Sequence, residues 1–133
     1  MSEVPNRDQM IERLEKTVEL AGAQLGPGDV AELAAVMKAM CLALTDIDAR
    51  CYVVFRGSGE ADFTMEDPAL EPTLTITTTA GVFDRMATGE ANPAMELAMR
   101  KVKMTGVPVT RLAKVGGNLI DTLFKCYREA LSS

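Results

Sequence analysis

Residues 73–106 read TLTITTTAGVFDRMATGEANPAMELAMRKVKMTG and carry most of the information about the fold, because a strand, two short helices and a second strand follow one another. Leu74 and Ile76 alternate with threonines, which is the period of a strand with one apolar face. Phe83 and Met86 then follow at helical spacing. The segment predicts one wall of a hollow, toward which these apolar side chains point.

The helices of this stretch have explicit start and stop signals. Gly89 ends the first helix, because glycine readily takes the left-handed conformation of a helix terminus. Asn92 as N-cap and Pro93 at the first helical position open the next helix, on which Met95 and Met99 lie one turn apart. The pattern therefore predicts two separate short helices.

Two longer helices are predicted before this stretch. Asn6 with Gln9 forms a capping box that opens the first helix, and Gly26-Pro27-Gly28 stops it. Apolar residues then recur at steps of three and four from Val30 onward. The two helices predict a helical hairpin over residues 6–45.

The period changes after this hairpin. Residues 50–56, RCYVVFR, are apolar on both faces, as in a central strand, while residues 60–66 present one acidic face. Residues 73–79 and 102–105 supply further strands with a single apolar face. These segments predict a sheet-and-helix core over residues 49–107. The predicted fold class is α+β, with a mixed sheet of about four to five strands covered on one face by helices.

The carboxyl-terminal segment, residues 108–131, predicts a long amphipathic helix. Leu119, Leu123 and Phe124 belong to its apolar stripe, and Gly116-Gly117 splits it or acts as a hinge. Two roles remain open for this helix, a lid over the hollow or a plug that fills it.

Composition limits the function classes. A chain of 133 residues predicts a single domain over 1–133. The net charge of −5, with scattered Lys and Arg, argues against a nucleic-acid surface. No apolar run is long enough for a bilayer span and no secretory leader is visible, so we expect an integral membrane segment to be absent and the location to be cytoplasmic.

Few residues of this chain are candidates for a catalytic role. The chain has no histidine, which excludes histidine-dependent catalysis. Cys41, Cys51 and Cys126 sit among apolar neighbours without C-x-x-C spacing, so neither a disulfide framework nor a zinc site is expected. Acidic pairs such as Asp46 with Asp48 are interpreted as solvated surface. We therefore expect no enzyme, no metal and no cofactor, with catalysis by Cys126 or a carboxylate pair as the remaining alternative.

Nine methionines are many for a chain of this length. Methionine is flexible and polarizable, which suits a surface that adapts to ligands of different shape. The same stripe on amphipathic helices is also typical of an ordinary solid core, and periodicity alone favours that interpretation.

The succession of a TLTITT strand, a helix carrying Phe83, the sequence GEANP, a short helix and a KVKMTG strand resembles the sterol carrier protein-2 (sterol-transfer) family. The similarity covers residues 52–112, and members are small α/β proteins that hold a lipid in an apolar tunnel. The resemblance implies an apolar ligand-binding wall. Its residues would be Leu74, Ile76, Phe83, Met86, Met95, Met99, Met104, Leu119, Leu123 and Phe124.

The resemblance implies non-enzymatic binding and transfer of a lipid, with a fatty acid, fatty acyl-CoA or sterol-like molecule as ligand. Flexible chains suit a methionine-rich wall better than rigid sterols do. Arg100, Lys101 and Lys103 either meet a head group or form a solvated strand face. The alternative function is an accessory or interaction module that presents a lipid-like substrate to a partner enzyme, and a homodimer would bury excess apolar helix surface.

Overall fold

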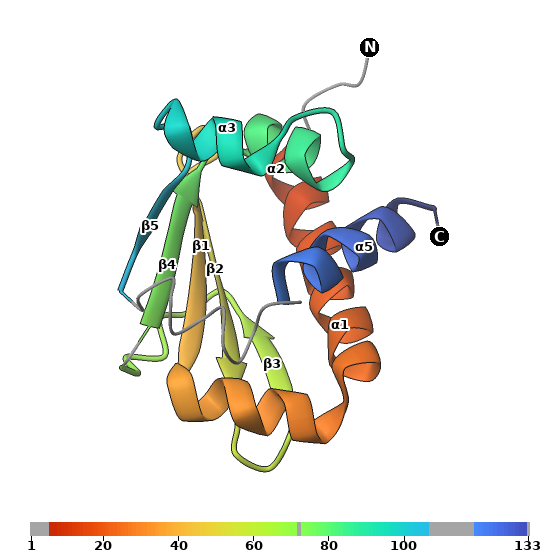
Figure 1. Ribbon diagram of the computed structural model, residues 1–133, viewed down its shortest axis with the longest axis vertical. Coiled ribbons are helices and arrows are strands. Elements are labelled where there is room, and N and C mark those ends of the chain that lie inside the picture. The colour runs from red at the N-terminus through yellow and green to blue at the C-terminus, as the bar shows by residue number, and fades with distance from the viewer. Residues whose placement is uncertain (1–5, 72, 107–118, 133) are drawn as a thin grey trace.

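The computed structural model describes residues 6–71, 73–106 and 119–132, which form a five-stranded sheet with helices against one face (Figure 1). This α+β architecture, with a mixed sheet, an N-terminal helix and a C-terminal helix, confirms the predicted fold class. The elements in chain order are α1 (Arg7–Val36), β1 (Ala39–Leu44), β2 (Ala49–Phe55), β3 (Ala61–Thr64), β4 (Thr73–Thr78), α2 (Ala80–Ala87), α3 (Pro93–Ala98), β5 (Lys103–Thr105) and α5 (Leu119–Ser132).

The sheet has the order β3-β2-β1-β4-β5. β1 is parallel to β4, and the other neighbouring pairs are antiparallel. The register places Leu42 of β1 between Cys51 and Ile76, and Ile76 in turn lies opposite Met104. Because side chains of paired residues point to the same face, these four form one apolar row across four strands.

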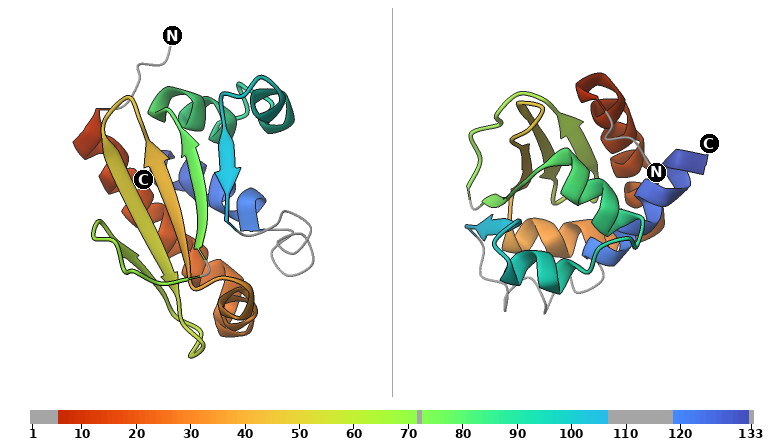
Figure 2. Two further views of the ribbon diagram at one scale, coloured as in Figure 1. Left: turned by 90° about the vertical axis from the view of Figure 1, so that its left-hand side faces the viewer. Right: turned by 90° about the horizontal axis from the view of Figure 1, so that it is seen from above.

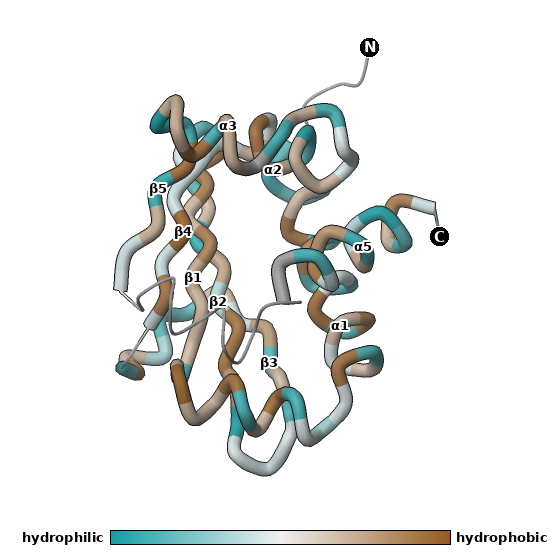
Figure 3. The backbone as a smooth tube through the Cα atoms, viewed as in Figure 1, coloured by the Kyte–Doolittle hydropathy of each residue, from teal (hydrophilic) through white to brown (hydrophobic). Residues whose placement is uncertain are grey.

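The helices cover only one face of the sheet. Viewed from the side of the bare face, the strands lie in front and the helices behind them (Figure 2). α1 packs against β2 and β3, and α5 lies beside α1 on the helical side of the sheet, whereas α2 and α3 cross the end at which β4 finishes (Figures 1 and 2). Hydrophobic residues predominate along the central strands and alternate with hydrophilic residues along α1 (Figure 3). None of the helices in the described part is long and apolar enough to cross a bilayer.

The prediction of a second helix that runs to Leu44 is wrong, because Ala39–Leu44 is the strand β1. All six residues of AMCLAL are buried. β1 lies in the sheet interior between β2 and β4, so both of its faces are apolar and no alternation marks it as a strand. Without alternation, its apolar residues were compatible with helical spacing.

The helical hairpin over 6–45 is also wrong. Gly26 has φ 79° and ψ 163°, which bends α1, and the second part of the helix turns across the end of the sheet (Figure 1). Pro27 follows at once, because its fixed φ suits the first turn of a helix and it needs no N–H partner there. The two helical parts therefore meet at a bend without folding back on each other.

The predicted start and end signals of the helices are present in the structure. The Asn6 side chain accepts a hydrogen bond from the Gln9 N–H at 2.8 Å, and the Gln9 side chain accepts one from the Asn6 N–H at 3.1 Å. Asn92 caps α3, and Gly89 has φ 85°, as predicted. The cap of α2 is Thr79. Of the predicted helix over 108–131, the part within α5 is present, and residues 108–118 lie outside the described residues.

Candidate functional site

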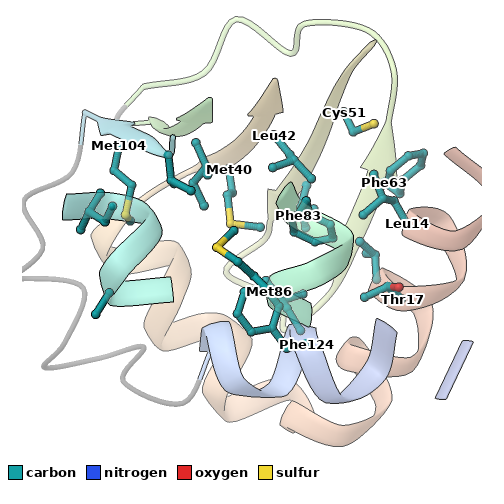
Figure 4. Close-up of a pocket in the computed structure, with 17 residues that line it drawn as sticks. Leu14, Thr17, Met40, Leu42, Cys51, Phe63, Phe83, Met86, Met104 and Phe124 are labelled. Carbon is teal, nitrogen blue, oxygen red and sulfur yellow. The ribbon is translucent and has the colours of Figure 1, made fainter. Parts of the chain in front are cut away.

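An apolar cavity of about 230 Å³ lies between the inner face of the sheet and the helices (Figure 4). Its wall takes residues from β1 to β5 and from all the helices of the described part. The described lining side chains are apolar apart from a single threonine, and they are Leu14, Thr17, Val18, Met40, Leu42, Cys51, Val53, Phe63, Ile76, Phe83, Met86, Ala94, Leu97, Val102, Met104, Leu123 and Phe124.

The sheet side of the cavity is the apolar row across the strands. Leu42, Cys51 and Met104 point from the sheet into the same space, toward which Met86 and Phe124 point from the helices (Figure 4). The wall therefore combines rigid strand positions with flexible methionine side chains, which can change rotamer to follow the shape of a ligand.

Aromatic contacts hold the helical side of the cavity together. Phe83 of α2 meets Phe124 of α5 edge to face, with ring centroids 5.9 Å apart, and meets Tyr127 in the same way at 5.4 Å. Edge-to-face pairs place the positive ring edge on the negative ring face, and each stabilises by about 0.5–1.5 kcal/mol. Phe83 is thus fixed in orientation by α5.

A buried polar cluster behind this wall joins three helices. The Tyr127 hydroxyl donates to Asp84 Oδ1 at 2.6 Å, and Arg13 Nη1 lies 3.7 Å from the same oxygen. Burial, and then the hydrogen bond to Asp84, raises the pKa of Tyr127 above its ordinary value, so the phenol remains a donor. The cluster ties α5 to α2 and α1, and the sequence alone had no signal that paired these residues.

The described wall offers no polar group for catalysis. The Thr17 hydroxyl already donates to the Arg13 carbonyl oxygen at 2.6 Å. Burial raises the pKa of the Cys51 thiol to about 11, so this thiol is protonated at neutral pH. Within the described residues no three His, Cys, Asp or Glu side chains gather where they could hold a metal ion. The described part of the wall can take up an apolar molecule and carries no acid, base or ionised nucleophile.

Cys126 does not have the surroundings of a nucleophile either. Its side chain is buried, and burial followed by the charge of Glu129 raises the pKa of the thiol. A reactive cysteine needs the opposite shift, because the thiolate is the attacking species.

Most of the predicted wall residues do lie at the cavity, namely Ile76, Phe83, Met86, Met104, Leu123 and Phe124. Leu74 is fully buried in the adjoining core and does not contact the cavity. The side chain of Leu119 lies outside the described part of the structure. Ligand contact by any of these residues stays a prediction.

The prediction that Met95 and Met99 of α3 line the hollow is wrong. Met95 and Met99 are 61% and 58% exposed, and Ala94 and Leu97 contact the cavity instead. α3 has only six residues, so the spacing of its apolar residues cannot show which side meets the rest of the fold.

Other wall residues were missed in the sequence. Met40 and Leu42 were assigned to a helix, although β1 directs both into the cavity. Leu14 and Val18 were recognisable as part of the apolar stripe of α1, but not as neighbours of a hollow. Val53 belongs to a strand that was predicted, and only the register shows that it faces inward.

Fold and cavity together define a class of small α+β proteins in which one face of a mixed sheet and a helical layer enclose an apolar pocket. The sequence model of the SCP-2 sterol transfer family matches residues 11–114. The chain belongs to this family. A search of curated proteins found none that matches the sequence.

Solved structures show the same fold at low identity. A conserved hypothetical protein from Thermus thermophilus, described as possibly a sterol carrier protein, has a TM-score of 0.55 and 13% identity, over 98% of this chain and 92% of that one. The apo form of sterol carrier protein 2 from Yarrowia lipolytica also has a TM-score of 0.55, with 15% identity over 89% and 88% of the two chains.

A much longer chain is similar over part of its length. The sec-alkylsulfatase Pisa1 from Pseudomonas sp. has a TM-score of 0.47 and 14% identity, and the match covers 71% of this chain but 13% of the sulfatase. The two structures with a TM-score of 0.55 show the fold alone at these identities, and the family match shows to which family the chain belongs.

Proposed function

We propose that the protein is a non-enzymatic carrier that binds a lipid by its acyl chain in the apolar cavity and transfers it. The cavity wall carries this proposal, because its one described polar side chain, Thr17, already has a hydrogen-bond partner within α1. The described wall therefore has no free side-chain hydrogen-bonding group for a polar ligand. It suits a hydrocarbon chain, which needs no hydrogen bond.

The size of the cavity supports a flexible chain as the ligand. An engineered apolar cavity of about 150 Å³ in another protein stays dry and binds benzene. The cavity of about 230 Å³ described above is larger than that and is lined partly by Met40, Met86 and Met104. Three adaptable side chains favour fatty acids and fatty acyl-CoA over rigid sterol-like ligands.

The free energy of binding would come from removing methylenes from water. Each buried methylene contributes about 0.8 kcal/mol, so ten contribute on the order of 8 kcal/mol. Lost translational and rotational freedom opposes this term. Micromolar affinity therefore requires that most of the acyl chain enters the cavity.

The polar head of the ligand would remain outside. Arg100 and Lys101 follow α3 directly and are exposed, and Leu97 of α3 contributes to the cavity wall. Lys103 alternates with Met104 on β5, so it lies with Thr105 on the opposite face of the sheet. A carboxylate or phosphate head beside the cavity could therefore pair with Arg100 or Lys101 while the chain lies within.

Two measurements test the carrier function. Mass spectrometry of an organic extract of the native protein should find acyl lipids in near-stoichiometric amount, and the emptied protein should take up a fluorescent fatty acid. An empty extract together with no uptake would contradict the proposal. That combination would favour the accessory module, for which crosslinking and pulldown should then recover a defined partner.

A matched pair of variants on β5 locates the binding site. Met104→Asp places a carboxylate on the cavity wall, whereas Thr105→Asp places one on the exposed opposite face of the same strand. At pH 8 the first variant should lose fatty acid uptake at least tenfold, because an apolar chain cannot solvate a charge, and the second should bind normally. Uptake that persists in a folded Met104→Asp protein would rule out this wall.

A further inference from the structure

Two of the helices that enclose the cavity, α5 and α3, are attached to the fold with very different strength. α5 is fixed by buried groups, because the Tyr127 hydroxyl donates to Asp84 and Arg128 Nη1 donates to the Ala87 carbonyl oxygen at 2.7 Å. Tyr127 and its neighbour Cys126 are fully buried. An element with such contacts opens only together with much of the fold. α5 is therefore a fixed wall of the cavity.

α3 is attached much more weakly. It crosses the end of the sheet at which β4 finishes, and its Ala94 and Leu97 line the cavity there (Figure 1). Neither side chain is buried, and 46% of Leu97 stays exposed. Among the described residues, one hydrogen bond joins residues 92–101 to the rest of the fold, from Thr78 Oγ1 to the Lys101 carbonyl oxygen at 2.9 Å. A segment with so few buried contacts is among the first to open.

The buried side chain among those described on α3 is a carboxylate. Glu96 is 9% exposed, and its Oε2 has no hydrogen-bond partner in the described structure. Its ion-pair partner is Lys101, whose Nζ lies 3.8 Å from Oε2 and whose side chain is 45% exposed to solvent. A buried carboxylate oxygen without a donor destabilises a structure more than such a half-exposed pair stabilises it. Glu96 therefore opposes the seated position of α3 and regains water when α3 lifts.

We infer that α3 is the lid through which a lipid enters and leaves the cavity, and that Glu96 keeps this lid easy to open. The hydrogen bonds locate its hinges. The Ala91 N–H is bonded to the Arg85 carbonyl oxygen of α2 at 3.0 Å, and the Lys101 carbonyl is held by β4, so residues 92–100 form the part that lifts. The passage of a lipid rests on the carrier function proposed above, whereas the motion of the lid does not.

Substitutions at the two partners should move the lid in opposite directions. Glu96→Met keeps the length of the side chain and removes the buried carboxylate, so the lid should open at least tenfold less often. Glu96→Gln should act in the same direction and replaces Glu96→Met if that variant does not fold. Lys101→Met leaves the carboxylate without compensation, so the lid should open several-fold more often. If the pair were a latch that holds the lid shut, all three variants would open more often.

Alkylation of Cys51 by iodoacetamide measures the opening without any lipid, because this thiol lines the cavity. At pH 8 its rate should fall at least tenfold in Glu96→Met and rise several-fold in Lys101→Met. Glu71→Met is the matched control and should leave the rate unchanged, because Glu71 is exposed on the loop before β4, at the other end of that strand.

Low concentrations of urea separate lid opening from global unfolding. Opening a lid exposes little surface, so the wild-type rate at Cys51 should barely change with urea. Cys126 is buried away from the described wall, and its rate should rise steeply with urea, as expected for global unfolding. If the two rates rise together, Cys51 reacts only in the unfolded chain and the lid is overturned.

Stopped-flow fluorescence relates the lid to lipid exchange. Glu96→Met should slow both the uptake and the release of a fluorescent fatty acid at least tenfold and leave its affinity unchanged, because a lid alters the two rates equally. If Cys51 responds as expected but no fatty acid binds, the carrier function fails and the lid stands. The lid is overturned if Cys51 reacts faster in both the Glu96 and Lys101 variants or equally in all proteins. It is also overturned if fatty acid binds but exchanges at the wild-type rate in Glu96→Met.

Discussion

Cys51 lies on β2 with its side chain on the cavity wall and only 3% exposed. Burial is the main reason that its pKa rises from 9.0 to about 11, and the nearby Cys41 adds to the shift. Because this thiol borders the cavity, its reactivity reports on what the cavity contains.

Alkylation of Cys51 should be slow in the folded protein. At pH 8 roughly one thiol in a thousand is ionised for a pKa near 11, about a hundredfold fewer than in the unfolded chain. Iodoacetamide followed by peptide mapping, with and without urea, measures the difference. At pH 10 bound fatty acid should slow modification of Cys51 further but leave Cys126, which is off the described wall, unaffected.

The same shift makes the folded state less stable in alkali. The unfolded thiol loses its proton near pH 9.0 and the folded thiol near pH 11, so between these values the unfolded state binds fewer protons. This contribution to stability is complete below pH 9 and is lost as the pH rises toward 11. Equal alkylation rates for folded and unfolded protein at pH 8 would show that Cys51 is not buried as described.

Tyr127 illustrates how a single hydroxyl organises the helical layer. It is fully buried, and its bond to Asp84 connects α5 with α2, while Arg13 adds a contact from α1. A buried carboxylate without partners would be costly, so the three groups support one another. The cluster keeps Phe124 of α5 at the cavity.

At the scale of the elements, the end of β5 lies very close to the backbone of β4. Gly106 ends this strand with φ 104°, and a Cβ on it would overlap the carbonyl oxygen of Thr73. Gly89 has a similar φ of 85°, but a Cβ there would meet nothing within 4 Å. The two glycines thus share backbone conformation and differ in their surroundings.

Replacing each glycine by alanine should separate these two effects. Gly89→Ala should cost about 1–2 kcal/mol, the strain of a left-handed alanine. Gly106→Ala should cost at least about 2 kcal/mol more, because β5 must move away from β4, and it should weaken fatty acid uptake through the displacement of Met104. Urea unfolding measures both variants. Equal costs would mean that β5 does not approach Thr73 as the structure shows.

At the scale of the whole molecule, the question is whether the interior is hollow. Val53 and Val54 are neighbours on β2, both 8% exposed, but Val53 lines the cavity and Val54 points to the opposite face of the sheet. The pair therefore allows the same substitution on the two faces at one point of the sheet.

Val53→Phe should fill part of the cavity, whereas Val54→Phe should place its ring on the face of the sheet that no described helix covers. Overpacking a solid core costs about 1–3 kcal/mol, so with a cavity beside Val53 we expect less than about 1 kcal/mol for either variant. Val53→Phe should lower fatty acid uptake, and Val54→Phe should leave it unchanged. Unfolding in urea together with fatty acid titration tests this, and a loss of stability of about 1–3 kcal/mol for Val53→Phe alone would indicate a solid core.

Local chemistry was enough to predict much of the molecule. The capping residues Asn6 and Asn92 act within one helical turn, so their effect can be predicted from the sequence. Alternation in β4 and the one-sided pattern of β3 likewise depend on adjacent residues that meet opposite environments. These signals sufficed for the α+β fold class and for placing Ile76, Phe83, Met86 and Met104 on apolar faces, whereas a cavity beside them was implied by the family resemblance.

The other features follow from which segments meet in space, and no short window of residues contains that information. β1 is a strand because β2 and β4 flank it, and its own apolar run suits a helix equally well. The short helix α3 turns Leu97 inward and Met95 outward only because of where α2 and β5 hold it. Whether the apolar faces close into a core or leave a cavity depends on the separation of the sheet from α1 and α5, a distance set by the packing of the complete fold.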